Sequence, residues 1–121
     1  MRIGELSRRT GVSERALRYY EEQGLLRPER RPSGYRVYRD ADVPAVRRIR
    51  VLLAAGLGVA QIAQALPCMV DDDGLLAPTC PELVAALVEH RDRIGEAIDE
   101  LEATRANLDA ILAAEVPRLS P

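Results

Sequence analysis

The sequence predicts a mainly α-helical protein, in which a head of short helices with one small β-hairpin is followed by one long helix. Three observations predict this fold class. Residues 1–26 place apolar residues at helical spacing around Gly11, residues 27–40 combine turn-forming and alternating residues, and residues 82–114 carry apolar residues that recur every seven positions. With 121 residues, the chain has room for one small domain and an appendage.

Charge is divided unevenly along the chain. Residues 1–50 carry thirteen arginines and seven acidic residues, a net charge of +6, whereas residues 51–121 carry four arginines and twelve acidic residues, a net charge of −8. A basic head on an acidic body predicts a polyanionic partner for the head. The sequence shows no apolar run long enough to cross a membrane and no leader, so we expect a cytoplasmic protein with no membrane partner.

Residues 3–24 are predicted to form two short helices joined by a tight turn. Gly11 suits the turn because glycine tolerates a positive φ, Ser13 is a good N-cap for the second helix, and Gly24 follows that helix as a C-cap. Two helices joined by a short turn with a glycine form a helix-turn-helix.

The second of these helices holds the candidate groove-reading residues. Arg15 and Arg18 lie three positions apart and Tyr19 lies one turn beyond Arg15, so the three side chains share one side of the helix. Arginine donates paired hydrogen bonds to guanine or phosphate, and a tyrosine hydroxyl donates to phosphate. Packing against Leu6 is the alternative for Tyr19 or Tyr20, but adjacent helix positions cannot all face the core.

The stretch RPERRPSGYRVYRD is predicted to form a small hairpin, a wing, that turns at Ser33-Gly34. Tyr35 and Arg36 are candidates for phosphate contacts outside the groove. Tyr38 is either a third such residue or the member of the strand that faces the core.

Two further helices and a loop complete the head. Asp40 or Asp42 is expected to cap a third helix, whose first turn tolerates Pro44, and residues 59–66 form a fourth helix that ends at Pro67. Residues 67–81, with a cysteine near each end, are interpreted as a connecting loop.

Residues 82–114 are predicted to form the long helix, which spans about 45–50 Å at 1.5 Å per residue. A tail of residues 115–121 follows it. Such a helix buries its apolar seam against another helix, and the simplest partner is the same helix of a second chain in a two-fold dimer. The seam consists of Leu87, Ile94, Ile98, Leu101 and Leu108.

Residues 1–66 resemble the N-terminal domain of the MerR family of bacterial transcription regulators. The motifs IGELSRRTGVS, LRYYEEQGLL and GYRVY carry the resemblance. It implies a winged helix-turn-helix at 1–66 and a homodimer held by an antiparallel coiled coil. It also implies double-stranded promoter DNA as the partner, distorted so that RNA polymerase engages both promoter elements. The candidate DNA contacts are Arg2, Ser13, Arg15, Arg18, Tyr19, Tyr20, Tyr35, Arg36 and Tyr38. Gly58 departs from the family pattern, in which many members carry a Ser or Thr cap.

A regulator of this kind responds to a signal, and the residues that sense it are a separate question. Cys68 and Cys80 are the candidate sensor residues. The pair could form a disulfide or react with an oxidant, the two thiolates could bind a soft metal ion, or both could be small apolar anchors of the loop. His90 is interpreted as a helix-surface or seam residue rather than a ligand. We assign neither a cofactor nor a metal site.

An enzyme and an interaction module are the two other classes of function to consider for this sequence. An enzyme is not expected, because the sequence shows neither a Ser–His–Asp-like set nor a Gly-rich phosphate loop. A coiled-coil interaction module that does not bind DNA is the remaining alternative, but it leaves the basic head and the wing unexplained.

Overall fold

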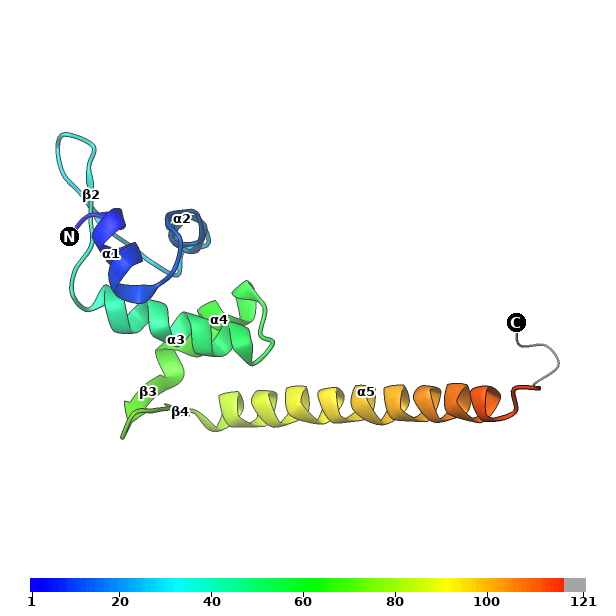
Figure 1. Ribbon diagram of the computed structural model, residues 1–121. Coiled ribbons are helices and arrows are strands. Elements are labelled where there is room, and N and C mark those ends of the chain that lie inside the picture. The colour runs from blue at the N-terminus through cyan, green and yellow to red at the C-terminus, as the bar shows by residue number, and fades with distance from the viewer. Residues whose placement is uncertain (117–121) are drawn as a thin grey trace. The chain divides into compact units, whose positions relative to one another are not determined.

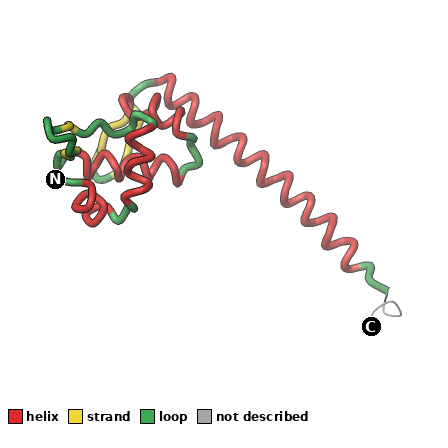
Figure 2. Tube along the Cα trace, turned by 90° about the horizontal axis from the view of Figure 1, so that it is seen from above, coloured by secondary structure: helices red, strands yellow, loops and turns green. Residues whose placement is uncertain are grey.

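A computed structural model describes residues 1–116 (Figure 1). These residues divide into two units, Met1–Cys80 and the residues from Pro81 onward. The first unit holds four α-helices, one 3₁₀ turn and two hairpins, and the second holds one long helix (Figures 1 and 2). The expected mainly α-helical fold class is confirmed.

The helix-turn-helix forms as its local residues predict. Helix α1 (Ile3–Thr10) ends at Gly11, whose φ of 74° is left-handed and whose N–H donates to the Ser7 carbonyl at 2.8 Å. Helix α2 (Glu14–Glu22) begins after Ser13, whose Oγ accepts from the N–H of Ala16 at 3.1 Å.

A Schellman turn ends α2 at the expected glycine. Gly24 has a φ of 77°, and its N–H donates to the Glu21 carbonyl at 3.0 Å. The N–H of Leu25 donates to the Tyr20 carbonyl at 2.9 Å, which is the second bond of this motif. The turn returns Leu26 to the core, where it is buried.

The wing is a two-stranded antiparallel hairpin, with β1 (Glu29–Arg30) paired to β2 (Arg36–Val37). Its turn runs from Arg31 to Gly34, which has a φ of 89°, so the predicted turn at Ser33-Gly34 is confirmed.

Helix α3 (Asp42–Ala54) tolerates Pro44 near its start, as expected, but its cap differs from the prediction. Ala41 occupies the N-cap position, and neither Asp40 nor Asp42 caps the helix with its side chain. The buried Asp42 carboxylate instead accepts a hydrogen bond from the backbone N–H of Arg39 at 2.8 Å, and so gives that N–H a partner.

Helix α4 (Val59–Ala65) runs into a single 3₁₀ turn, η1 (Leu66–Cys68). Gly58 at its N-cap has no side chain to offer. The backbone N–H of Gly58 donates to Gln61 Oε1 at 2.8 Å, so one half of a capping box remains.

A second hairpin occupies the segment expected to be a loop. Strand β3 (Met69–Asp72) pairs antiparallel with β4 (Leu75–Pro78) in register Met69↔Pro78. The two-residue turn is Asp73-Gly74, with φ values of 51° and 80°, which is the backbone geometry that Asp-Gly favours between two strands. The prediction of an irregular loop is therefore wrong for these ten residues.

The core of the first unit is aliphatic, with two tyrosines. It joins both helices of the helix-turn-helix to α3 and α4, and α1 and α3 pack closely. Its largest fully buried side chains are Tyr38, Leu6, Leu17, Ile49, Ile62 and Val46. This packing fixes α2 and leaves one of its faces exposed.

Helix α5 (Pro81–Ala113) contains 33 residues, close to the predicted 82–114, and buries none of them among the described residues. Most of its predicted apolar seam is not packed against other described residues. Leu101 is 69% exposed, and Ile94, Ile98 and Leu108 are also exposed. Within the described residues, no helix combines the length and apolar character needed to span a membrane.

Candidate nucleic-acid interface

Helix α2 presents two faces with different chemistry. Leu17 and Tyr20 are buried against the core, whereas Arg15, Arg18 and Tyr19 are exposed, Tyr19 at 46%. Arg18 makes only a weak ion pair with Glu14 at 3.7 Å, one turn earlier on the surface. The three predicted residues are therefore free to meet a ligand.

The Tyr35 ring of the wing lies beside the guanidinium group of Arg2, the residue before α1. Tyr35 is 54% exposed, and the guanidinium carbon of Arg2 lies 3.6 Å from the centroid of its ring. A cation over a ring face at an exposed site contributes about 0.5–1 kcal/mol. This contact orients Arg2 beside the wing.

Glu21 ties the wing to α2. Its carboxylate lies 3.1 Å from Nε of Arg36 and 3.7 Å from an Nη of Arg30, and the Tyr38 hydroxyl donates to it at 3.4 Å. Its side chain is only 15% exposed, which strengthens these interactions relative to those of a surface pair. Glu21 thus sets where the two wing arginines lie.

An arginine-lined cleft results from this arrangement. It has a volume of about 290 Å³ and lies between the start of α1, helix α2 and the wing. We name it the arginine cleft. Its lining residues are Arg2, Ile3, Arg18, Arg30, Gly34, Tyr35 and Arg36. Four guanidinium groups around one concave surface, with one carboxylate behind them, can bind phosphate oxygens and base edges.

The structure brings together four of the predicted DNA contacts, Arg2, Arg18, Tyr35 and Arg36, at the arginine cleft. Ser13 is exposed and caps α2, as described above. Arg30 and Glu21 were not predicted from the sequence. Their roles depend on the contact of the wing with α2.

Tyr20 and Tyr38 are corrections. Tyr20 is 6% exposed and Tyr38 is 1% exposed, so both rings belong to the core and not to the exposed surface that holds the other candidates. Both were candidate DNA contacts for which packing in the core was the alternative, and their burial agrees with that alternative. Burial raises the pKa of Tyr38, and the nearby Glu21 carboxylate adds to this rise.

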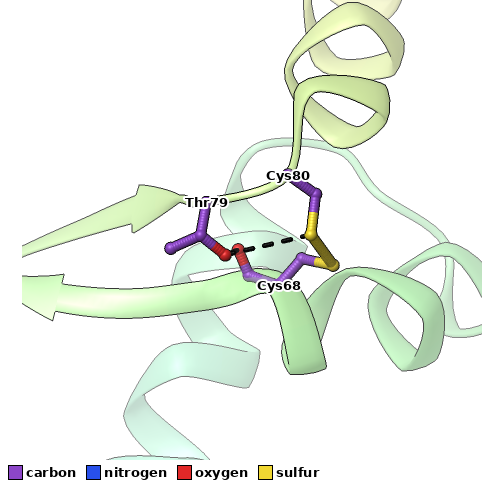
Figure 3. Close-up of a disulfide and its surroundings, with 3 residues drawn as sticks. All are labelled: Cys68, Thr79 and Cys80. Atoms are coloured by element: carbon purple, nitrogen blue, oxygen red, sulfur yellow. Dashed lines mark hydrogen bonds between the residues drawn. A yellow bond between two sulfur atoms is a disulfide. The ribbon is translucent and has the colours of Figure 1, made fainter.

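Cys68 and Cys80 are joined by a disulfide (Figure 3). Their Cα atoms lie 5.7 Å apart, where β3 begins and where β4 has ended. Thr79 holds the same point, because its backbone N–H and its Oγ1 donate to the Cys68 carbonyl at 2.7 and 2.9 Å. Among the described residues, no group of three or more His, Cys, Asp or Glu residues gathers as a metal site would require.

An ion pair anchors the hairpin to the head. Nε and Nη2 of Arg48 on α3 both donate to one carboxylate oxygen of Asp71 on β3. The hairpin is therefore fixed both to α3 and, through the disulfide, across its own open end.

Comparison with known proteins agrees with this geometry. The family model described as MerR HTH family regulatory protein matches residues 1–67, and the model described as MerR, DNA binding matches residues 43–111.

Several relatives share the match. The HTH-type transcriptional regulator HmrR of Rhizobium leguminosarum bv. viciae is 36% identical over 108 residues, which cover 89% of this chain and 83% of the relative. Heavy metal-dependent transcription regulator 2 of Rhizobium meliloti is 45% identical over 67 residues, which make up 46% of its length. The HTH-type transcriptional regulator ZntR of Escherichia coli K12 is 28% identical over 111 residues, covering 91% of this chain and 77% of the relative.

Among solved structures, the transcription regulator PbrR691 of Ralstonia metallidurans CH34, in complex with lead(II), superposes with a TM-score of 0.75 at 30% identity. The match covers 98% of this chain and 93% of that one. The helix-turn-helix, the wing, the arginine cleft and these matches together show that the chain belongs to the MerR family of DNA-binding transcription regulators.

Proposed function

We propose that this chain is one protomer of a homodimeric regulator that binds a pseudo-palindrome within a promoter. The observation that carries the proposal is the arginine cleft beside the exposed face of α2. The helix presents groove-reading side chains, while the arginines of the cleft take phosphates on the flanking backbone.

The exposed seam of α5 supports the dimer. Apolar side chains recur along the helix at Leu87, Ile94, Leu101 and Leu108, and no residue of α5 is buried within the described chain. A second copy of the same helix supplies a seam of matching period, and two-fold symmetry then presents two heads to two half-sites. An antiparallel coiled coil through these residues is the arrangement we propose.

The dimer acts by changing DNA shape. Two heads joined at a fixed separation bind two half-sites and bend or untwist the base pairs between them, and the free energy of that deformation sets how well RNA polymerase engages the promoter. This role requires no catalysis and places the protein in the cytoplasm with the chromosome.

A soft metal ion is a second candidate for the signal. The name of one relative, Heavy metal-dependent transcription regulator 2, and the lead(II) complex of PbrR691 favour it. Cys68 and Cys80 are the two cysteine thiolates that this chain offers once their bond is reduced. Native mass spectrometry of the reduced chain after addition of Cu(I) or Zn(II) alone tests it, and a bound ion lost in Cys68→Ser would support it.

The regulator assignment is tested by binding to the DNA upstream of the gene, with a shuffled duplex of equal length as the control. We expect promoter binding to be at least about a thousandfold tighter than binding to the shuffled DNA. Two phosphate contacts per protomer give a slope of log K against log salt of about −4 or steeper. Equal affinity for both duplexes would contradict the assignment and favour an interaction module.

A further inference from the structure

The hairpin from Cys68 to Cys80 is covalently closed at the point where the first unit ends. Cys80 is followed at once by Pro81, the first residue of α5. The disulfide therefore restrains the residue from which the long helix starts, and it does so from a position outside the arginine cleft.

We propose that Cys68 and Cys80 are a reversible oxidation site, whose disulfide and dithiol forms give the regulator two transcriptional outputs. This inference rests on the proposed function in one respect. A protein that binds promoter DNA works where thiol reductants keep most cysteines reduced, and disulfides in that compartment are typically transient and redox-sensing.

The surrounding contacts keep the two ends of the hairpin close together in either form. The β3–β4 register and the two hydrogen bonds from Thr79 to the Cys68 carbonyl do not depend on the sulfur–sulfur bond. Reduction therefore leaves both thiols within reach of each other, so the disulfide can form again without a search through an open loop. Arg48 and Asp71 keep the hairpin on α3 throughout.

Cys80 is the residue set up to react. It lies at the N-terminus of a 33-residue helix, whose dipole favours a thiolate (Figure 3). Both cysteines are half-buried and thus reachable from solvent.

Oxidation by a peroxide balances in two steps. The Cys80 thiolate attacks one peroxide oxygen, which forms a sulfenic acid and releases hydroxide or water. The Cys68 thiolate then attacks that sulfur, the disulfide forms, and a second water leaves after proton transfer. Two electrons pass from the thiols to the peroxide. A low-molecular-weight thiol reverses the change by exchange, and is itself converted to its disulfide.

The two forms differ in how Cys80 is held. With the disulfide intact, Cys80 is bonded to Cys68 at the end of η1. With the bond broken, the hairpin restrains Cys80 only through its neighbour Thr79. The arginine cleft shares no residue with this site, so each head keeps its affinity for its own half-site. The expected effect is therefore on DNA distortion and transcription, not on half-site binding.

The test uses the full chain equilibrated in mixtures of reduced and oxidised glutathione, then alkylated and weighed by mass spectrometry. We expect both thiols to become protected together over a range in which glutathione itself is mostly reduced. Promoter affinity and transcription by RNA polymerase are then measured on both forms. Transcription should differ by at least about fivefold, the low end of ordinary coupling between two sites.

Cys68→Ser and Cys80→Ser are the control variants. Each should give one output under both conditions, equal to that of the reduced parent chain. Equal transcription from the two forms of the parent would overturn the proposal, as would a disulfide that survives excess reductant. A response of the reduced chain to Cu(I) alone, with no response to glutathione, would also overturn it. If neither form prefers the promoter to shuffled DNA, the proposed function fails, while the alkylation pattern still decides whether the site is reversible.

Discussion

Replacing Glu21 with glutamine tests whether this one carboxylate positions the DNA-binding wing. The substitution keeps the shape of the side chain and removes its charge. The Glu21 carboxylate forms an ion pair with Arg36, 3.1 Å from its Nε, accepts a hydrogen bond from the Tyr38 hydroxyl at 3.4 Å, and lies 3.7 Å from Arg30.

The size of the effect follows from burial. A hydrogen bond to a charged group contributes about 1.5–3 kcal/mol, and the Glu21 side chain is 15% exposed. The Arg30 side chain is 63% exposed, so its longer contact adds well under about 1 kcal/mol. Glutamine still accepts one hydrogen bond. We therefore expect Glu21→Gln to lower the free energy of unfolding by about 1–2 kcal/mol, which lowers the Tm by about 5–15 °C at a fixed protein concentration.

The matched control is Glu22→Gln, which changes the charge equally at the next, exposed position of the same helix. Both variants add one positive charge near DNA, and salt screens that effect over about 8 Å. Promoter affinity of Glu21→Gln relative to Glu22→Gln therefore isolates the positioning of the wing. We expect a loss of about tenfold, which corresponds to about 1.4 kcal/mol. If the two variants melt and bind alike, Glu21 does not position the wing.

Three further outcomes are expected. Arg18→Ala should weaken promoter binding by about 1–3 kcal/mol and leave the dimer intact. The control variant Arg93→Ala, on α5, should bind the promoter normally. Normal promoter binding by Arg18→Ala would show that α2 is not part of the DNA interface. Leu101→Arg should yield monomers at micromolar concentration by analytical ultracentrifugation, because Leu101 lies on the seam, 69% exposed in one chain, and its burial recurs twice in a symmetric dimer. Ala103→Arg, two positions away on the opposite side, should remain dimeric, and a dimer in both would contradict the seam. Burial and Glu21 raise the pKa of Tyr38 above its usual 10.0. The contribution of neutral Tyr38 to the free energy of unfolding is therefore fully present below about pH 10 and is lost as the pH rises through the folded-state pKa. Tyr38→Phe should remove that part of the decline in urea titrations at pH 9–11.

Local signals in the sequence were enough for the helix-turn-helix. Gly11, Ser13 and Gly24 each act through backbone geometry within a few residues, so their roles follow from residue type alone. The exposed arginines of α2 were also predictable, because helical spacing fixes which side chains share a face.

Features that depend on pairing between distant segments were harder to predict. Asp73-Gly74 is a strong hairpin signal, but residues 67–81 were interpreted as a connecting loop, and the pairing of β3 with β4 shows a hairpin instead. The inward side of Tyr38 depends on the register of the wing. The role of Glu21 depends on arginines nine and fifteen positions away, which only the folded wing brings to it.

The cations of the arginine cleft are all guanidinium groups, and the sequence contains no lysine. Guanidinium stays protonated at every pH that a cell reaches, and enzymes that acetylate lysine find no side-chain substrate anywhere on this chain. The positive charge of the cleft is thus insensitive to acid stress and to lysine acetylation. Neither of these can therefore switch the protein through that charge.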